Sequence, residues 1–412
     1  MLALPVKFCR LALFNLMLVA FAGVILRYKI AWPLTFVDQK NFLHAHSHFA
    51  FAGWVSQALM ALLTGYLAEK NNNAHFNKYK LLMYANLFTA YGMLFSFAAQ
   101  GYAFLSILFS VLSILVSYIF IIVYWRDLSA LQDSSSSHYW FKAALVFNAI
   151  SSLGPFMLAY MMASKHIIQH LYLASVYFFL HFQYNGWFFF VCMGLLCHQL
   201  EKYHISQQKL KQVFWLFAIA CVPAFFLSAL WLKIPQWLYF FVIIAACMQL
   251  LGWWLLVKIA GNVTIEIKRS IPRLGTYLFL LSAIALTIKL CLQTGSVIPF
   301  LSKLAFGFRP IVIGYLHLVL LAVITIFLIA YMYSFKFLSL NKITISGIIV
   351  FVSGIFINEI LLMIHGIADL NYQKVAFMPL LLFITALILF TGIALINYGQ
   401  SQKINSSTNL LH

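Results

Sequence analysis

Three histidines within five residues are the side chains of this sequence best placed to do chemistry. They stand in the string His44-Ala-His46-Ser-His48, which opens a long apolar segment. Imidazole nitrogens bind haem iron, copper and zinc. Polar groups at membrane depth are costly and usually mark a pathway or a cofactor. We therefore predict a cofactor or metal site here; the structural alternative is a solvated trio at the membrane surface.

The spacing of these histidines divides them between two faces of a helix. Residues two apart point about 200° from each other, so His46 faces away from His44 and His48, which share a face. His46 shares its own face with Ala50 and Gly53. Small residues beside an imidazole leave room for a flat macrocycle, which makes His46 the first choice among the three and His48 the second.

A fourth histidine lies inside a later apolar run, Arg309-Pro-Ile-Val-Ile-Gly-Tyr-Leu-His317. Pro310 is favourable in the first turn of a helix, so a helix is expected to begin there. His317 would then lie about 12 Å along that helix from Arg309. Ligation by His317, with Arg309 placed outward of it, is one interpretation. A buried histidine bonded to a neighbour and a snorkelling arginine form the other.

A long aromatic segment contains a second group of polar side chains. His170 stands near its start, and His181, Gln183, Tyr184 and Asn185 form a patch near its middle. Unsatisfied polar groups at that depth would each cost several kcal/mol, so each must have a partner. His181 and Tyr184, three residues apart, are candidates for a proton-conducting pair, and a purely structural patch is the alternative.

Acidic residues are nearly absent from the apolar segments. Glu359 is the clear exception, with His365 and Asp369 following it. An intramembrane carboxylate is a functional candidate by default, and a structural pairing with an arginine or a tyrosine is the alternative.

The elements that must position these residues are membrane helices. The chain has 412 residues, of which 64% are hydrophobic and 8% charged. Apolar runs of about 20 residues, long enough to cross a bilayer, recur from end to end. The sequence therefore predicts an all-α, polytopic transmembrane bundle of about 12 helices. The predicted spans are 9–26, 43–67, 80–100, 103–124, 140–163, 168–198, 212–232, 236–257, 273–293, 310–333, 343–366 and 375–397.

The basic residues predict how these spans are oriented. The net charge is +18, and 17 of the 26 basic residues lie at the termini or near the loops after even-numbered spans, against 9 near the other loops. Positive loops stay inside, which predicts cytoplasmic N- and C-termini. Most histidines singled out above then lie in the outer half of the membrane. Because the charges lie in short loops, nucleic-acid binding is not expected.

The remaining sequence features predict one membrane domain over residues 1–400 and a polar tail over 401–412. The six cysteines lie in or beside apolar runs and form neither Cys-x-x-Cys nor a covalent haem motif, so we expect buried apolar residues. The apolar stretch near the N-terminus lacks a convincing cleavage site and is interpreted as the first span. No role is expected for the other loop and terminal histidines, His75, His138, His198, His204 and His412.

Taken together, these features resemble subunit I of the haem–copper oxidases, a family that includes the nitric oxide reductases. The resemblance covers the whole chain in architecture and is most specific in motif at the string His-x-His-x-His-Phe-x-x-x-Gly-Trp of residues 44–54. It implies a non-covalent, b-type haem held by a histidine of span 43–67 and by His317. It also implies copper, with His170 or His181 as a ligand.

The sequence departs from that family at two places. Tyr315 and Val319 stand where a second histidine of span 310–333 would be needed, and span 212–232 contains no histidine. The active-site haem of the family therefore lacks its histidine here, the copper lacks the two ligands of span 212–232, and we interpret the chain as a divergent member.

The function expected from the resemblance is electron transfer, or the binding or reduction of a diatomic gas such as O2 or NO, in a cell membrane. This would be an oxidoreductase activity of the cytochrome oxidase or nitric oxide reductase type. An electron-donor protein or quinol would supply the electrons, and the protein would assemble with further oxidase-like subunits. The alternative is a transporter or metal-handling permease with histidines as copper or zinc ligands.

Overall fold

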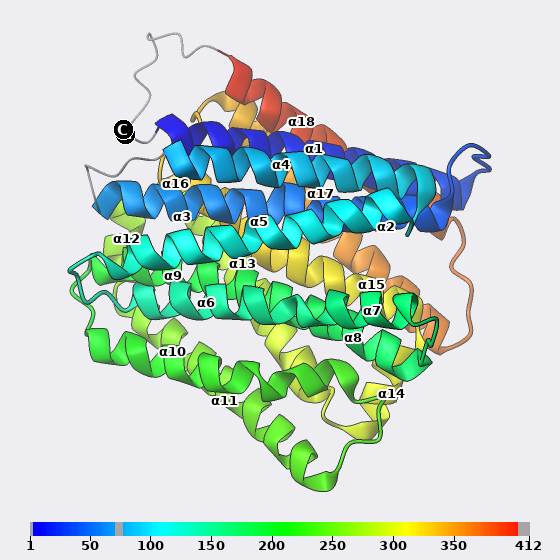
Figure 1. Ribbon diagram of the computed structural model, residues 1–412. Helices are drawn as coiled ribbons and strands as arrows, with labels where there is room; N and C mark the ends of the chain where they lie inside the picture. The colour runs from blue at the N-terminus through cyan, green and yellow to red at the C-terminus, as the bar shows by residue number, and fades with distance from the viewer. Residues whose placement is uncertain (1–2, 71–76, 403–412) are drawn as a thin grey trace. The chain divides into compact units, whose positions relative to one another are not determined.

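The protein is an all-helical, polytopic membrane protein, as predicted. The computed structural model describes residues 3–70 and 77–402, with the backbone alone for 303–306, and contains no strand within these ranges (Figure 1). Ten helices of the described residues are long and apolar enough to cross a membrane. An eleventh span results if the bent pair described below is counted as one.

Each of the 12 predicted spans coincides with helical structure. The segment over 168–198 is helical from Gln169 to Glu201 but is not among the ten, because its polar patch lowers the mean hydropathy. The count of 12 and the cytoplasmic side of the termini stay predictions.

The chain forms two compact units. Unit 1 comprises Met1–Ser113, Ile329–Ile364 and Val375–His412, and unit 2 comprises Ile114–Leu328 and His365–Lys374. The prediction of one domain over residues 1–400 stays a prediction. Most of the predicted tail, together with His75 and His412, lies outside the described residues.

Unit 1 is built from the two ends of the chain. Its elements are α1 (Ala3–Ala31), α2 (Gln39–Phe49), η1 (Ala50–Ser56), α3 (Gln57–Lys70), α4 (Asn77–Gln100), the start of α5 (Phe104–Ser129), the end of α16 (Ile326–Ser334), most of α17 (Lys342–Leu370) and α18 (Met378–Ser401). The first helix packs along the last, and α2 packs against α4.

Contacts far apart in sequence hold α1 and α18 together. Asn397 Nδ2 of α18 donates to the Leu13 carbonyl of α1 at 3.1 Å, and Phe383 packs edge-on against Trp32. At the start of α1, Arg10 donates to Ser339 Oγ, whose backbone N–H donates to Gln400 Oε1. The beginning of α1 and the end of α18 therefore lie at the same end of unit 1.

Unit 2 contains the middle of the chain. Its elements after α5 are α6 (Ser137–Ser151), α7 (Leu153–Ala163), α8 (Gln169–His181), η2 (Phe182–Phe188), α9 (Phe189–Glu201), α10 (Gln207–Cys221), η3 (Pro223–Ala229), α11 (Gln236–Gly261), α12 (Thr264–Ser270), α13 (Arg273–Gly295), α14 (Pro299–Gly307), α15 (Arg309–His317) and η4 (Leu318–Thr325). Within this unit α6 packs on α9 and η2, α10 on α11, and α13 on η4.

The predicted span 212–232 is bent. Its helix α10 and the 3₁₀ segment η3 meet at 47°, immediately before Pro223. Proline has no backbone N–H to donate and clashes with the preceding turn, which interrupts an α-helix.

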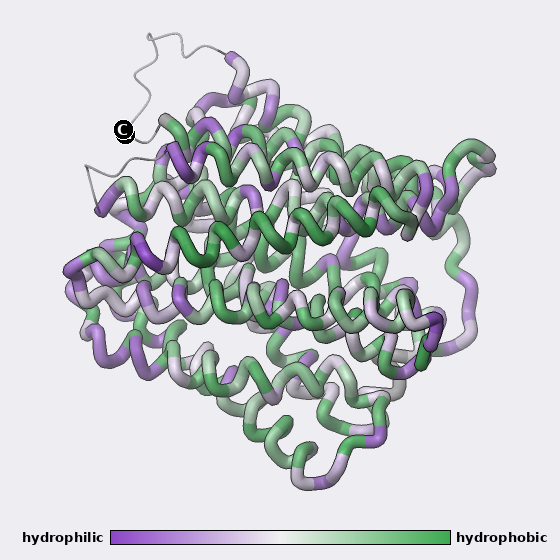
Figure 2. Tube along the Cα trace, in the orientation of Figure 1, coloured by the Kyte–Doolittle hydropathy of each residue, from purple (hydrophilic) through white to green (hydrophobic). Residues whose placement is uncertain are grey.

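Hydrophilic residues gather at the helix ends and hydrophobic residues along the helix middles (Figure 2). The cysteines only partly follow the expectation of burial. Cys9, Cys192, Cys197 and Cys221 are buried, whereas Cys247 and Cys291 are exposed. These two lie on outward faces of α11 and α13, where an apolar side chain needs no protein partner in a bilayer.

Candidate functional site

Three π-helical segments occur in the described residues, and each one directly follows a turn that contains a histidine. Segment η1 begins two residues after His48, η2 begins after His181, and η4 begins after His317. A π-helix is rare and occurs mostly as short insertions at functional sites. These three lie in the spans over 43–67, 168–198 and 310–333, the same spans in which the sequence placed candidate ligands.

Side chains of neighbouring helices satisfy the backbone of η1. The amide of Asn86 in α4 donates to the Ala52 carbonyl at 3.0 Å and to Gln57 Oε1 at 2.8 Å. The amide of Asn15 in α1 donates to the Gly53 carbonyl at 2.6 Å. Asn86 and Asn15 therefore supply hydrogen bonds that a wider helical turn makes less well by itself.

The other two π-helical segments accept similar contacts inside unit 2. Ser282 Oγ of α13 donates to the Val323 carbonyl of η4 at 2.8 Å. Cys221 Sγ of α10 lies 3.9 Å from the Asn185 carbonyl of η2, a weak thiol hydrogen bond. In each case a polar side chain from another helix contacts a carbonyl of the π-helical segment.

The histidines of α2 divide between two faces, as predicted. Asp38 caps the helix by accepting from the Asn41 backbone N–H at 2.8 Å. His46 faces α1, where its Nδ1 lies 3.1 Å from the Val19 carbonyl. His44 and His48 face the end of α4 and the turn that follows it.

His46 has the geometry of an oriented metal ligand. Its Nδ1–H donates to the Val19 carbonyl, which fixes the ring and leaves Nε2 with the lone pair. No other described residue forms a hydrogen bond with this ring. Gly23 of α1 lies beside it: a Cβ there would be 3.7 Å from His46 Cε1, so the residue leaves that ring edge uncovered. Arg27, one turn further along α1, lies within electrostatic range.

The space expected beside Gly53 is filled. A Cβ at Gly53 would lie 2.6 Å from the Phe49 ring, which is itself fully buried and packs against Tyr91. The expectation that Gly53 leaves room for a macrocycle next to His46 is therefore wrong. Phe49 lies four residues before Gly53 on the same face and its ring covers it, and the small residue beside His46 is Gly23 instead.

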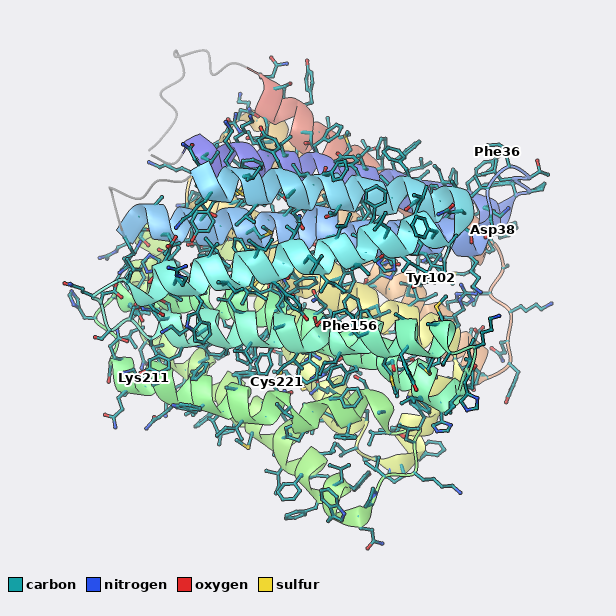
Figure 3. The ribbon with its side chains drawn as sticks, viewed as in Figure 1. Phe36, Asp38, Tyr102, Phe156, Lys211 and Cys221 are labelled. Carbon is teal, nitrogen blue, oxygen red and sulfur yellow. The ribbon has the colours of Figure 1, made fainter. Side chains whose placement is uncertain are left out.

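His44 and His48 are held by aromatic side chains. The His48 ring stacks on Phe97 with 4.3 Å between centroids, and its Nε2 lies 3.3 Å from the Tyr102 hydroxyl. His44 packs edge-on against Tyr102. Tyr102 lies at the same end of unit 1 as Asp38 (Figure 3). These contacts make His48 a weaker ligand candidate than His46.

The turn that carries Tyr102 depends on glycine. Gly101 has a φ of 62°, in the left-handed region that favours glycine. A Cβ at this position would lie 2.3 Å from Asn41 Oδ1. Ser106 closes the turn by donating to the Gly101 carbonyl at 2.6 Å.

His317 ends α15, which begins at Arg309 with Pro310 in the first turn, as predicted. Its Nδ1 donates to the Ile313 carbonyl at 2.9 Å, one turn earlier. The ring is therefore oriented in the same manner as that of His46, by a backbone carbonyl. Arg309 is exposed at the start of the helix.

His181 is buried, and both of its ring nitrogens have protein partners. Nε2 donates to the Cys221 carbonyl at 2.9 Å, and Nδ1 accepts from the Asn185 amide at 3.1 Å. The expected pair with Tyr184 is not formed, because the Tyr184 hydroxyl bonds to Ser228. Asn185, four positions on, is the residue of this segment that contacts the ring. Gln183 donates to Ser151 Oγ at 2.7 Å.

The remaining candidates have simpler surroundings. His170 is exposed in the first turn of α8. Glu359 accepts from the Asn358 amide at 3.1 Å, so its described partner is an amide rather than the expected arginine or tyrosine. His365 Nε2 lies 3.7 Å from Asp369, one turn further along α17.

Lys289 was missed by the sequence analysis. This residue of α13 is only 5% exposed, and it lies within electrostatic range of His181 and Cys221. One turn further, Gln293 donates to Gln249 Oε1 at 2.6 Å. The signal was available, since a lysine inside a predicted span is a functional candidate by default.

No protein-family model matches this chain, and no curated protein is significantly similar to it. Across residues 3–70 and 77–402, no three histidine, cysteine, aspartate or glutamate side chains are grouped so that they could hold a metal ion.

Proposed function

We propose that this chain is a haem-binding integral membrane protein, with His46 as an axial ligand of a b-type haem. The observation that carries the proposal is the position of the π-helical segments, each directly after a histidine turn in a span that the resemblance assigns to cofactors. The donor set fits haem, because His46 is oriented through Nδ1 by a carbonyl and keeps Nε2 for a metal.

The residues around His46 have separate roles in this proposal. Val19 fixes the tautomer and the ring orientation, and Gly23 keeps the ring edge clear. Arg27 supplies a cation for a haem propionate, and Arg309, placed outward of His317 where propionates would point, is expected to supply another. His317 as a second axial ligand stays a prediction from the resemblance.

A haem held in this way would supply one-electron chemistry, with a potential set by its ligands and buried surroundings. The functional class we propose is accordingly electron transfer, or binding or reduction of O2 or NO. Copper ligation by His170 and His181 is the less favoured part of the resemblance, because both nitrogens of His181 already bond to protein groups.

The experiment is the visible spectrum of the purified protein and of single histidine variants. The wild type is expected to show a Soret band and extractable haem b. His46→Ala and His317→Ala should each remove or convert the low-spin signal. His48→Ala is the matched control, two positions away on the other face of the same helix, and should retain it because its ring already packs on Phe97 and Tyr102.

Two results would contradict the proposal. Purified protein without haem, but with bound copper or zinc that depends on the same histidines, would favour the metal-handling permease. An unchanged spectrum in both His46→Ala and His317→Ala would show that haem is held elsewhere.

A further inference from the structure

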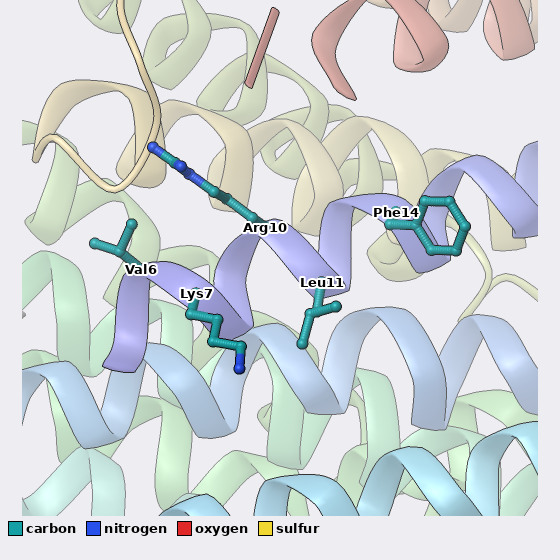
Figure 4. Close-up of a pocket in the computed structure, with 5 residues that line it drawn as sticks. All are labelled: Val6, Lys7, Arg10, Leu11 and Phe14. Atoms are coloured by element: carbon teal, nitrogen blue, oxygen red, sulfur yellow. The ribbon is translucent and has the colours of Figure 1, made fainter. Parts of the chain in front are cut away.

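A groove lies along the beginning of α1 in unit 1. Its volume is about 560 Å³, and Val6, Lys7, Arg10, Leu11 and Phe14 line it (Figure 4). Val6 and the two cations stand at the end nearer the N-terminus. Leu11 and Phe14 follow one turn later, and Phe14 is 42% exposed.

Both cations are held in place without being neutralised. Lys7 Nζ donates to the Tyr84 hydroxyl at 2.8 Å and lies over the same ring. Arg10 donates to Ser339 Oγ at 3.1 Å. These partners are neutral hydroxyls, and neither cation pairs with a carboxylate of the described residues. Two ordered positive charges therefore border the groove.

The order of polarity along α1 identifies the kind of occupant. Along α1 toward the middle of the predicted span, each cation is followed by an apolar side chain about 6 Å further on, Leu11 after Lys7 and Phe14 after Arg10. A phospholipid has the same order, with its phosphate at the interface and its acyl chain directed inward. Free phosphate would leave Leu11 and Phe14 uncovered. A partner helix would need carboxylates of its own to match the two cations, whereas a phospholipid supplies negative charge and an apolar chain in one molecule.

We propose that this groove binds an anionic phospholipid, with Leu11 and Phe14 along an acyl chain and with Lys7 and Arg10, which extend to different sides of α1 (Figure 4), attracting the anionic headgroup from either side. Basic pockets between membrane helices on the cytoplasmic side suit such headgroups. The predicted cytoplasmic N-terminus places the groove in the leaflet where anionic lipids are enriched. The binding site is independent of the haem proposed above.

The first test uses the wild-type protein. Native mass spectrometry is performed with phosphatidylglycerol and phosphatidylcholine that have identical acyl chains. A photoreactive phosphatidylglycerol then maps the contact. We expect preferential retention of phosphatidylglycerol and crosslinks on the peptide that contains Leu11 and Phe14. Equal retention of both lipids, or crosslinks confined to other helices, would overturn the proposal. This test needs no variant, so it does not depend on whether a variant folds.

The second test removes the two charges. Lys7→Gln with Arg10→Gln should lower retention of phosphatidylglycerol by roughly 30-fold, with phosphatidylcholine unchanged, since each cation near an anionic headgroup contributes about a fivefold preference. The matched control, Lys258→Gln with Arg269→Gln, removes the same two charges on the same predicted side and should retain the preference. If both double variants lose it equally, net charge rather than this groove attracts the lipid.

Discussion

At the scale of single residues, Lys289 opposes the stability of the helix that contains it. It is the one lysine or arginine that is buried among the described residues, and no described carboxylate forms an ion pair with it. Burying an ammonium without a counter-charge is costly. A residue that destabilises its own surroundings is expected to be retained for function, and the proposal for His46 does not use it.

Lys289→Met should therefore raise the thermal unfolding midpoint. The methionine keeps the apolar stem and removes the charge, and a gain of about 1 kcal/mol corresponds to roughly 2–4 °C in a unit of this size. Thermal unfolding in detergent measures it, with Lys258→Met at the end of α11 as a control that should be neutral. A lower midpoint for Lys289→Met would mean that the ammonium stabilises the fold.

At the scale of elements, the π-helical segments depend on side chains of other helices. Asn86→Leu removes the donor to the Ala52 carbonyl and to Gln57, leaving buried acceptors without partners. We expect a loss of about 1–3 kcal/mol of stability. Hydrogen exchange should become faster around residues 50–57.

The control for Asn86→Leu is Asn371→Leu. Asn371 also donates to a backbone carbonyl, that of Ile367, but it is exposed to solvent. Its replacement should change stability by less than about 0.5 kcal/mol. Equal effects of the two variants would show that η1 does not depend on the Asn86 amide.

The turn between α4 and α5 gives a second test at this scale. Gly101→Ala should destabilise unit 1 by roughly 1–2 kcal/mol, because an L-residue is strained at positive φ and its Cβ would collide with Asn41. Gly295→Ala at the end of α13, where the nearest atom would be 3.9 Å away, should be tolerated. Thermal unfolding compares the two, and a neutral Gly101→Ala would show that this turn relaxes freely.

Hydropathy and spacing were sufficient to predict the helices and the two faces of α2. They could not predict the π-helical segments, whose carbonyls accept from side chains distant in sequence, such as Asn15 and Asn86. The expectations for Gly53 and for the His181–Tyr184 pair were wrong because other side chains take those places, the Phe49 ring at Gly53 and Ser228 at the Tyr184 hydroxyl. The Cys221 carbonyl that accepts from His181 belongs to a helix bent at Pro223, which local periodicity does not reveal.

At the scale of the whole molecule, orientation in the membrane is the prediction on which the depth of every histidine depends. Reporter fusions after residues 70, 130 and 205 should report the cytoplasm, and a fusion near residue 165 the outside, because the basic residues favour that arrangement. A reversed pattern would place the His46 cluster and the groove at α1 in the opposite leaflets.

The packing of α1 against α18 has a consequence for the time course of synthesis. Leu13 and Asn397, which hydrogen-bond to each other, are 384 positions apart. At about 5–20 residues per second, the ribosome reaches Asn397 roughly 20–75 s after Leu13. Residues 114–328 of unit 2 are complete within that interval, while α1 still lacks its principal neighbour. The part of the protein that is made first is therefore the part that finishes folding last, and an early stop before α18 would leave unit 1 open and unit 2 nearly whole.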